Sequence, residues 1–210
     1  MRLSLPALLL ALAAPAAAQQ ADRGVYDILR GETALGREEF SIQPGSEGSA
    51  AGSTIASLAR YPGSRPVVQI QAVLERKADG TVTALQVDTR QGGQVSRVYG
   101  AAVQDNLTIR QTTPAAESVR EFPRSAGIVI LDDSVFAFYR VVADRATASG
   151  ARLPVLFPRT ARRGQLTATK TGPTTVEMTG AVSGTLTVDA TGRLLQVILS
   201  DGVSAIRQGR

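Results

Sequence analysis

The feature that most constrains the fold of this chain is one apolar segment, residues 128–146, with the sequence IVILDDSVFAFYRVVADRA. Between Ser134 and Ala143 the only charged residue is Arg140, so a helix here would be apolar on nearly all sides. Such a helix must be enclosed by the rest of the protein. We therefore predict a buried helix over residues 134–146. A strand is the alternative, because Val, Phe and Tyr also favour strands.

Side chains that suit the ends of a helix flank this segment. Asp132, Asp133 and Ser134 precede it and offer oxygens to the unpaired N–H groups of a first turn. Arg145 and Gly150 suit the C-terminal end. We predict that the Asp-Asp-Ser cluster caps the helix. The alternative, a catalytic or cation-binding role, requires further ligands from elsewhere in the chain.

The remainder of the chain consists of short runs typical of β-strands. Residues 67–77 form the clearest run, because Val68, Ile70, Ala72 and Leu74 alternate with polar residues. A turn at residues 78–80 then leads into a return strand, which predicts a hairpin. Similar runs and turns recur from residue 24 to residue 208, and they amount to about a dozen strands.

These elements predict the architecture. A sheet of about a dozen strands seldom stays flat, and an apolar helix needs cover on most of its sides. We predict a mainly β protein, in which a curved antiparallel meander, an open or closed barrel, surrounds the apolar helix. A two-layer sandwich with the helix across one end is the alternative.

The first twenty residues, MRLSLPALLLALAAPAAAQQ, have the pattern of a secretory leader. One positive charge at Arg2 precedes an apolar run and a triplet of small residues that ends at Ala18. We predict a signal peptide over residues 1–18; the alternative, a membrane anchor, is disfavoured because the apolar run is shorter than the roughly 20 residues that span a bilayer. Residues 19–210 are then a single β-rich domain, exported to the periplasm or the medium and not integral to a membrane.

Composition excludes several kinds of chemistry. The chain has no Cys and no His, which removes disulfides, Ser-His-Asp and Cys-His catalysis, and histidine metal ligands. We therefore predict no cofactor and no metal site. The net charge of +5 would attract anions, but the few aromatic residues are not interleaved with the basic ones, so we expect no nucleic-acid partner.

Two sets of residues are candidates for binding. The first would line a cavity for an apolar ligand between helix and sheet, and the alternative for it is an ordinary solid core. Its members are Leu74, Leu85, Val87, Phe136, Phe138, Tyr139, Leu195 and Val197. The second set, Arg159, Arg162 and Arg163, would contact an anion, and the alternative for it is a solvated loop.

Several short motifs together resemble uncharacterised bacterial periplasmic β-rich domains, whose half-barrel is similar to that of the lipoprotein-carrier proteins. The residues that carry the resemblance are Tyr26, Ile28, Gly31, Gly36, the run 132–139 and the turn Asp201-Gly202. The resemblance implies a half-barrel fold and a periplasmic location.

Three hypotheses for function follow. The first is a non-enzymatic, exported domain that binds a hydrophobic or amphipathic envelope ligand, such as a lipid, or an envelope protein. The second is a solid-core scaffold or protein-interaction domain. The third is a carboxylate-based hydrolase of polysaccharide, which needs two acids about 5–10 Å apart in a cleft. The adjacent acids Glu38 and Glu39 do not supply this pair, because neighbours on a strand point to opposite faces.

Overall fold

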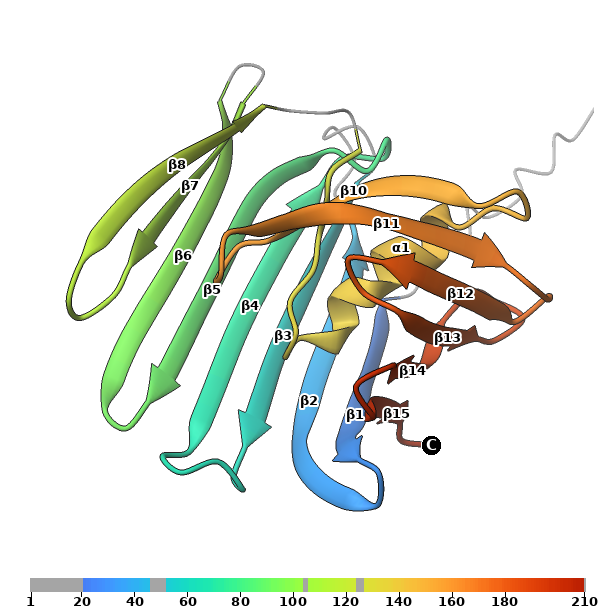
Figure 1. Ribbon diagram of the computed structural model, residues 1–210, viewed down its shortest axis with the longest axis horizontal. Helices are drawn as coiled ribbons and strands as arrows, with labels where there is room; N and C mark the ends of the chain where they lie inside the picture. Colours follow the sequence, from blue (N-terminus) through green and yellow to red (C-terminus); the bar gives the residue numbers. More distant parts are fainter. Residues whose placement is uncertain (1–20, 46–51, 104–105, 124–126, 210) are drawn as a thin grey trace, which may run out of the picture.

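The computed structural model describes residues 21–45, 52–103, 106–123 and 127–209, so the predicted signal peptide lies outside the described residues. Within these ranges fifteen strands join one sheet (Figure 1). In chain order they are β1 (Asp22–Arg30), β2 (Thr33–Pro44), β3 (Ser53–Tyr61), β4 (Val68–Arg76), β5 (Val82–Gln91), β6 (Gln94–Val103), β7 (Asn106–Thr112), β8 (Glu117–Pro123), β9 (Val129–Ile130), β10 (Ala151–Phe157), β11 (Arg162–Lys170), β12 (Thr175–Gly180), β13 (Gly184–Val188), β14 (Leu194–Leu199) and β15 (Val203–Arg207).

The sheet consists of two meanders, β1–β8 and β9–β15, which are joined by the pairing of the first strand with the last. The order across the sheet runs from β8 back to β1, then to β15, and from there back to β9. The pairing of β1 with β15 is antiparallel and sets Tyr26 opposite Arg207, whereas the short β9 pairs with β10 in parallel. The sheet does not close on itself, and its edges are β8 and β9. The predicted antiparallel meander is therefore confirmed, in its open form.

The predicted buried helix is also present, in a shorter form. A 3-10 turn, η1 (Phe136–Tyr139), continues directly into α1 (Arg140–Arg145). In Figure 1 the helix lies between the layer formed by β1–β5 and the strands β10–β13, which fold over it. The side chains of η1 are all buried. Among the described residues, no helix is long and apolar enough to cross a membrane.

Strand alternation separates an inner face, toward the helix, from an outer face on the opposite side of the sheet. On β4 and β5, Leu74 pairs with Leu85 and Ala72 with Val87, and all four are buried on the inner face. The predicted hairpin is confirmed. Positions between them, such as Gln86, point to the outer face and are exposed. No element that the structure describes packs over the outer face of β2–β7.

Candidate functional site

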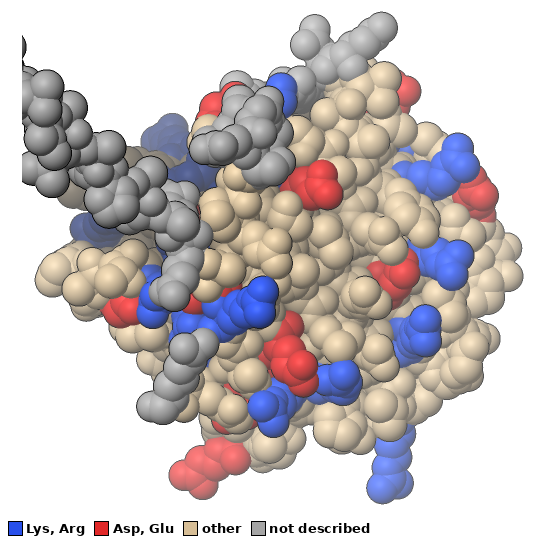
Figure 2. Space-filling model, turned by 180° about the vertical axis from the view of Figure 1, so that it is seen from behind, with Lys and Arg blue, Asp and Glu red and all other residues tan. Residues whose placement is uncertain are grey.

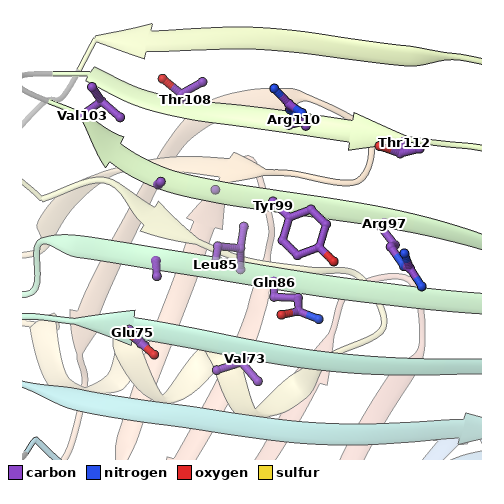
Figure 3. A pocket seen from close by; sticks show the side chains of 13 residues that line it. Val73, Glu75, Leu85, Gln86, Arg97, Tyr99, Val103, Thr108, Arg110 and Thr112 are labelled. Atoms are coloured by element: carbon purple, nitrogen blue, oxygen red, sulfur yellow. The ribbon is translucent and has the colours of Figure 1, made fainter.

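A groove of about 710 Å³ crosses the outer face of β4–β7 (Figure 3). We call it the outer groove. Its lining residues are Val73, Glu75, Ala84, Leu85, Gln86, Arg97, Tyr99, Gly100, Ala101, Val103, Thr108, Arg110 and Thr112. Most of them come from alternate positions of four neighbouring strands, so the groove follows directly from the period of two along each strand.

Small side chains make the hollow. In one cross-strand row Ala84 lies opposite Ala101, which in turn lies opposite Thr108. On the inner face Gly100 has no side chain, and a Cβ atom there would come within 2.8 Å of Ile109 Cδ1 and 3.1 Å of Leu85 Cβ. A side chain at Gly100 would displace the end of Ile109 and press on Leu85, so the close packing here favours glycine.

One aromatic ring and two arginines surround this floor. Tyr99 is 41% exposed, and its ring lies between β5 and β6, beside Gln86 (Figure 3). Arg110 forms an exposed ion pair with Glu117, with 3.5 Å between Nη1 and Oε1. Arg97 has no ion pair or side-chain hydrogen bond within the described part of the chain. The outer groove thus combines an apolar floor with a cation that has no ionic partner among the described residues.

The hollowed surface of the sheet is not confined to the outer groove. Figure 2, which shows the molecule from behind, has uncharged surface between scattered groups of acidic and basic side chains. A second groove of about 320 Å³, over β2–β4, shares Val73 with the outer groove. The hollowed surface therefore extends across much of the sheet.

The structure brings seven of the eight predicted ligand-lining residues together in the core, whereas Leu195 lies apart from them, in a pocket beside Asp22 and Arg193. Leu74, Leu85, Val87, Phe136, Phe138, Tyr139 and Val197 are buried, whereas Leu195 is partly exposed. The rings of Phe136 and Tyr139 stack with centroids 6.0 Å apart. Leu85 is the member of the set that also reaches the outer groove. Ligand contact by the other members stays a prediction.

The predicted anion-contact residues lie beside the Asp-Asp-Ser cluster, a proximity that the sequence did not indicate. The Nε and Nη2 atoms of Arg159 each donate to the Asp132 carboxylate at 2.6 Å, and Asp132 is only 2% exposed. Arg162 pairs with Asp133 at 2.8 Å. Arg163 lies over the Phe122 ring, 5.1 Å from its centroid. Two of the three arginines thus already contact carboxylates, and anion binding by this loop stays a prediction.

The prediction that the Asp-Asp-Ser cluster caps the helix is wrong. The helix begins at Phe136 with no capping side chain from Val135, and Asp132 Oδ1 instead accepts the Ser134 N–H at 2.9 Å. The cap comes from β2, which passes beside the start of the helix. The Glu38 carboxylate accepts hydrogen bonds from the backbone N–H groups of Phe136 and Ala137, at 2.7 and 3.1 Å.

Glu38 is a buried carboxylate that sequence reasoning had placed on a strand face without assigning it a partner. It is 0% exposed, and Ser57 Oγ donates to it at 2.6 Å. Burial raises the pKa of Glu38 to about 7, although the hydrogen bonds from Ser57 and the helix oppose the shift. The exposed Glu39 points the other way and pairs with Arg60 at 2.9 Å, which confirms the predicted opposition. The sequence did contain a signal for this burial, because Glu38 lies on the same strand face as the apolar Phe40.

Among the described residues, neither a carboxylate pair nor a metal cluster accompanies the outer groove. Glu75 is the single acid among the residues that line it. Within the described ranges, no group of three or more His, Cys, Asp or Glu side chains is placed to hold a metal ion. The groove therefore offers surfaces for binding, without an acid pair suited to glycoside hydrolysis.

Comparison with known families and with curated proteins gives no match. Among solved structures, the chain is similar to a DUF1089 family protein from Pseudomonas aeruginosa, with a TM-score of 0.49 and 17% sequence identity. The similarity covers 73% of this chain and 86% of that one. It assigns no function to the chain.

Proposed function

We propose that this protein is an exported, non-enzymatic binding domain of the bacterial envelope, and that its outer groove holds an amphipathic anion of the fatty-acid type. The observation that carries the proposal is the combination of an apolar floor with Arg97, which has no ionic partner among the described residues. An acyl chain would cover Val73, Ala84 and Ala101, and its carboxylate would pair with the guanidinium.

The dimensions of the outer groove suit such a ligand. Its volume of about 710 Å³ lies within the range of roughly 300–1,000 Å³ that small-molecule sites occupy. Tyr99 adds an exposed aromatic surface beside the floor. Arg110, on β7, lies opposite Tyr99 and is therefore the diagonal cross-strand neighbour of Arg97, so it supplies a second cation.

The proposal also includes the resemblance to periplasmic half-barrel domains that are similar to the lipoprotein carriers. In this chain the buried helix occupies the inner side of the curved sheet, where Phe136 and Phe138 are 0% exposed. We therefore place the ligand on the outer face. The predicted leader, residues 1–18, would deliver the protein to the compartment where such ligands occur.

A single tryptophan tests the proposal, because the chain has none of its own. A Tyr99→Trp variant carries one indole in the outer groove, and its fluorescence should be quenched saturably by a brominated palmitic acid. In that background Arg97→Gln should weaken binding about tenfold or more, since a hydrogen bond to a charged group contributes about 1.5–3 kcal/mol. Arg90→Gln is the matched control, an exposed arginine on β5 outside the groove lining.

Two outcomes would overturn the proposal. One is the absence of saturable quenching. The other is an equal effect of Arg97→Gln and Arg90→Gln on the dissociation constant. If the corresponding long-chain alcohol bound as tightly as the fatty acid, the carboxylate would not contribute to binding. The ligand would then be apolar and not anionic.

The alternative is a protein-interaction domain. It is favoured by large apolar side chains exposed near the open edge strand β8, namely Tyr99 at 41%, Val103 at 55% and Val119 at 53%. Native mass spectrometry of protein purified from a periplasmic fraction, followed by organic extraction, separates the two functions. Co-purified acyl chains support the ligand-binding domain, whereas a clean protein mass without fatty-acid uptake supports the interaction domain.

A further inference from the structure

A second, polar pocket of about 300 Å³ lies at the C-terminal end of the helix. We call it the helix-end pocket. Its lining residues are Gly52, Ser53, Arg76, Lys77, Ala78, Asp79, Gly80, Asp144 and Arg145. They come from the start of β3, the end of β4 with the turn that follows it, and the last two residues of α1. None of them lines the outer groove.

The carboxylates of this pocket only partly balance its cations. Arg76, Lys77 and Arg145 face the pocket together with Asp79 and Asp144. Asp144 is shared, because it accepts hydrogen bonds from Arg76 at 3.0 Å and from Arg140 at 2.6 Å. Its charge is therefore divided between two guanidinium groups.

Arg145 and Lys77 form no salt bridge with the residues that the structure describes. Arg145 donates from Nη1 to the backbone carbonyl of Gly127, a neutral acceptor. Lys77 has no ion pair or side-chain hydrogen bond to any residue that the structure describes. The helix-end pocket therefore contains cationic donors that the described residues do not fully satisfy.

Partial burial brings the cations of this pocket close together in a place that water reaches poorly. The side chain of Arg76 is 11% exposed. Burial, and to a lesser extent the nearby Arg76, lowers the pKa of the Arg145 guanidinium, and the carboxylate of Asp79 opposes the shift. Like charges repel more strongly where water is partly excluded, so an anion between them would be bound more firmly than on an open surface.

We propose that the helix-end pocket binds a small tetrahedral oxyanion of the phosphate monoester class, held by Arg145 and Lys77 with Arg76 at its wall. Guanidinium forks match the oxygens of phosphate, and the ammonium group supplies a further charge. The pocket volume of about 300 Å³ limits the bound part to one small group. The anion would be either free phosphate or the exposed phosphate of a lipid headgroup.

The lysine content of the chain permits a direct test. Lys77 and Lys170 are the two lysines of the sequence, and both are exposed. Reductive methylation with 13C-formaldehyde gives each lysine its own NMR signal. On titration with inorganic phosphate, the Lys77 signal should shift saturably, whereas the Lys170 signal should stay in place. Equal shifts of the two signals, or the same shift with sodium chloride at matched ionic strength, would overturn the proposal.

Two variants locate the anion. Arg145→Gln retains an amide donor for the Gly127 carbonyl and should weaken the phosphate response of Lys77 at least fivefold, whereas Lys170→Gln should leave it unchanged. If Arg145→Gln does not fold, the exposed Lys77→Gln serves instead, and it should abolish the rise in Tm that phosphate produces in the native chain. An unchanged rise would contradict the assignment.

Vesicles distinguish the two sources of the phosphate. Co-sedimentation with phosphatidic acid vesicles but not with phosphatidylcholine vesicles, lost in Arg145→Gln, would assign the site to a lipid headgroup. A saturable response to inorganic phosphate without co-sedimentation would assign it to the free anion.

Discussion

The carboxylate of Glu38 accepts a hydrogen bond of 2.7 Å from the backbone N–H of Phe136, which lies 98 positions later in the chain. The neighbouring Ala137 N–H is bound by the same carboxylate. The start of the helix is therefore held by β2, through an acid with no exposed surface. Because this acid carries a raised pKa, the anchoring of the helix is coupled to pH.

The first prediction concerns that coupling. The pKa of Glu38 rises from 4.5 to about 7 on folding, so the folded state binds more protons between these values. The free energy of unfolding should therefore have its full Glu38 contribution below pH 4.5, and lose about 3 kcal/mol of it as pH rises to about 7. On protonation Ser57 can change from donor to acceptor, which keeps the contact satisfied.

Urea unfolding at a series of pH values measures this effect. Glu38→Gln has no proton to lose, while the other acids titrate alike in both proteins and cancel in the difference. The free energy of unfolding of the native chain should fall relative to that of the variant between pH 4.5 and 7. Parallel profiles would show that Glu38 does not titrate in this range.

The architecture was largely predictable because its signals are local. The alternation of Ile70, Ala72 and Leu74 with polar residues fixes the two faces of β4, and the turn that follows fixes the hairpin. The apolar segment from Ser134 to Ala143 likewise requires enclosure, and so predicts a curved sheet around it. The sequence did not separate the two residues of β9 from this segment, which is one reason why the sheet has more strands than predicted.

The polar contacts were not predictable, because their partners are distant in the sequence. The Arg159 side chain reaches Asp132 over 27 positions, and nothing local to either residue specifies the pairing. The outer groove was missed for a different reason. Alternating polar positions on β4–β7 indicated a solvated face, but its hollow depends on which small residues lie opposite each other, such as Ala84 and Ala101.

The second prediction compares two adjacent acids. Asp132→Asn should lower the free energy of unfolding by about 2–4 kcal/mol, because it leaves the half-buried Arg159 without its charge partner. Asp133→Asn should cost less than about 1 kcal/mol, since Asp133 and Arg162 form an exposed pair. Urea unfolding at low and at high salt measures both effects. Similar costs for the two variants would contradict the assigned difference in burial.

The third prediction concerns the packing of the helix. Phe136 is 0% exposed and stacks on Tyr139, so Phe136→Ala should cost about 3–5 kcal/mol if the inner side is a solid core. Thermal unfolding should show a fall in Tm of about 6–20 °C. Val119→Ala, at an exposed position on β8, should change stability by no more than about 0.5 kcal/mol. A fall of less than a few degrees for Phe136→Ala would favour a ligand cavity beside the helix.

The fourth prediction contrasts two buried tyrosines. Tyr26 donates its hydroxyl to the Leu194 carbonyl at 3.0 Å, a contact that links β1 to β14 across the intervening β15. Tyr26→Phe should therefore cost about 1–2 kcal/mol, because it leaves a buried carbonyl without its donor.

Tyr139 presents the opposite case. Its hydroxyl oxygen is buried without a hydrogen-bond partner in the described part of the chain. Tyr139→Phe removes an unsatisfied polar group and keeps the ring that stacks on Phe136, so it should be neutral or stabilising. Urea unfolding of both variants at one pH measures the contrast. A cost for Tyr139→Phe as large as that for Tyr26→Phe would mean that its hydroxyl makes a hydrogen bond in solution, and would place a bound water or ligand group at that end of the core.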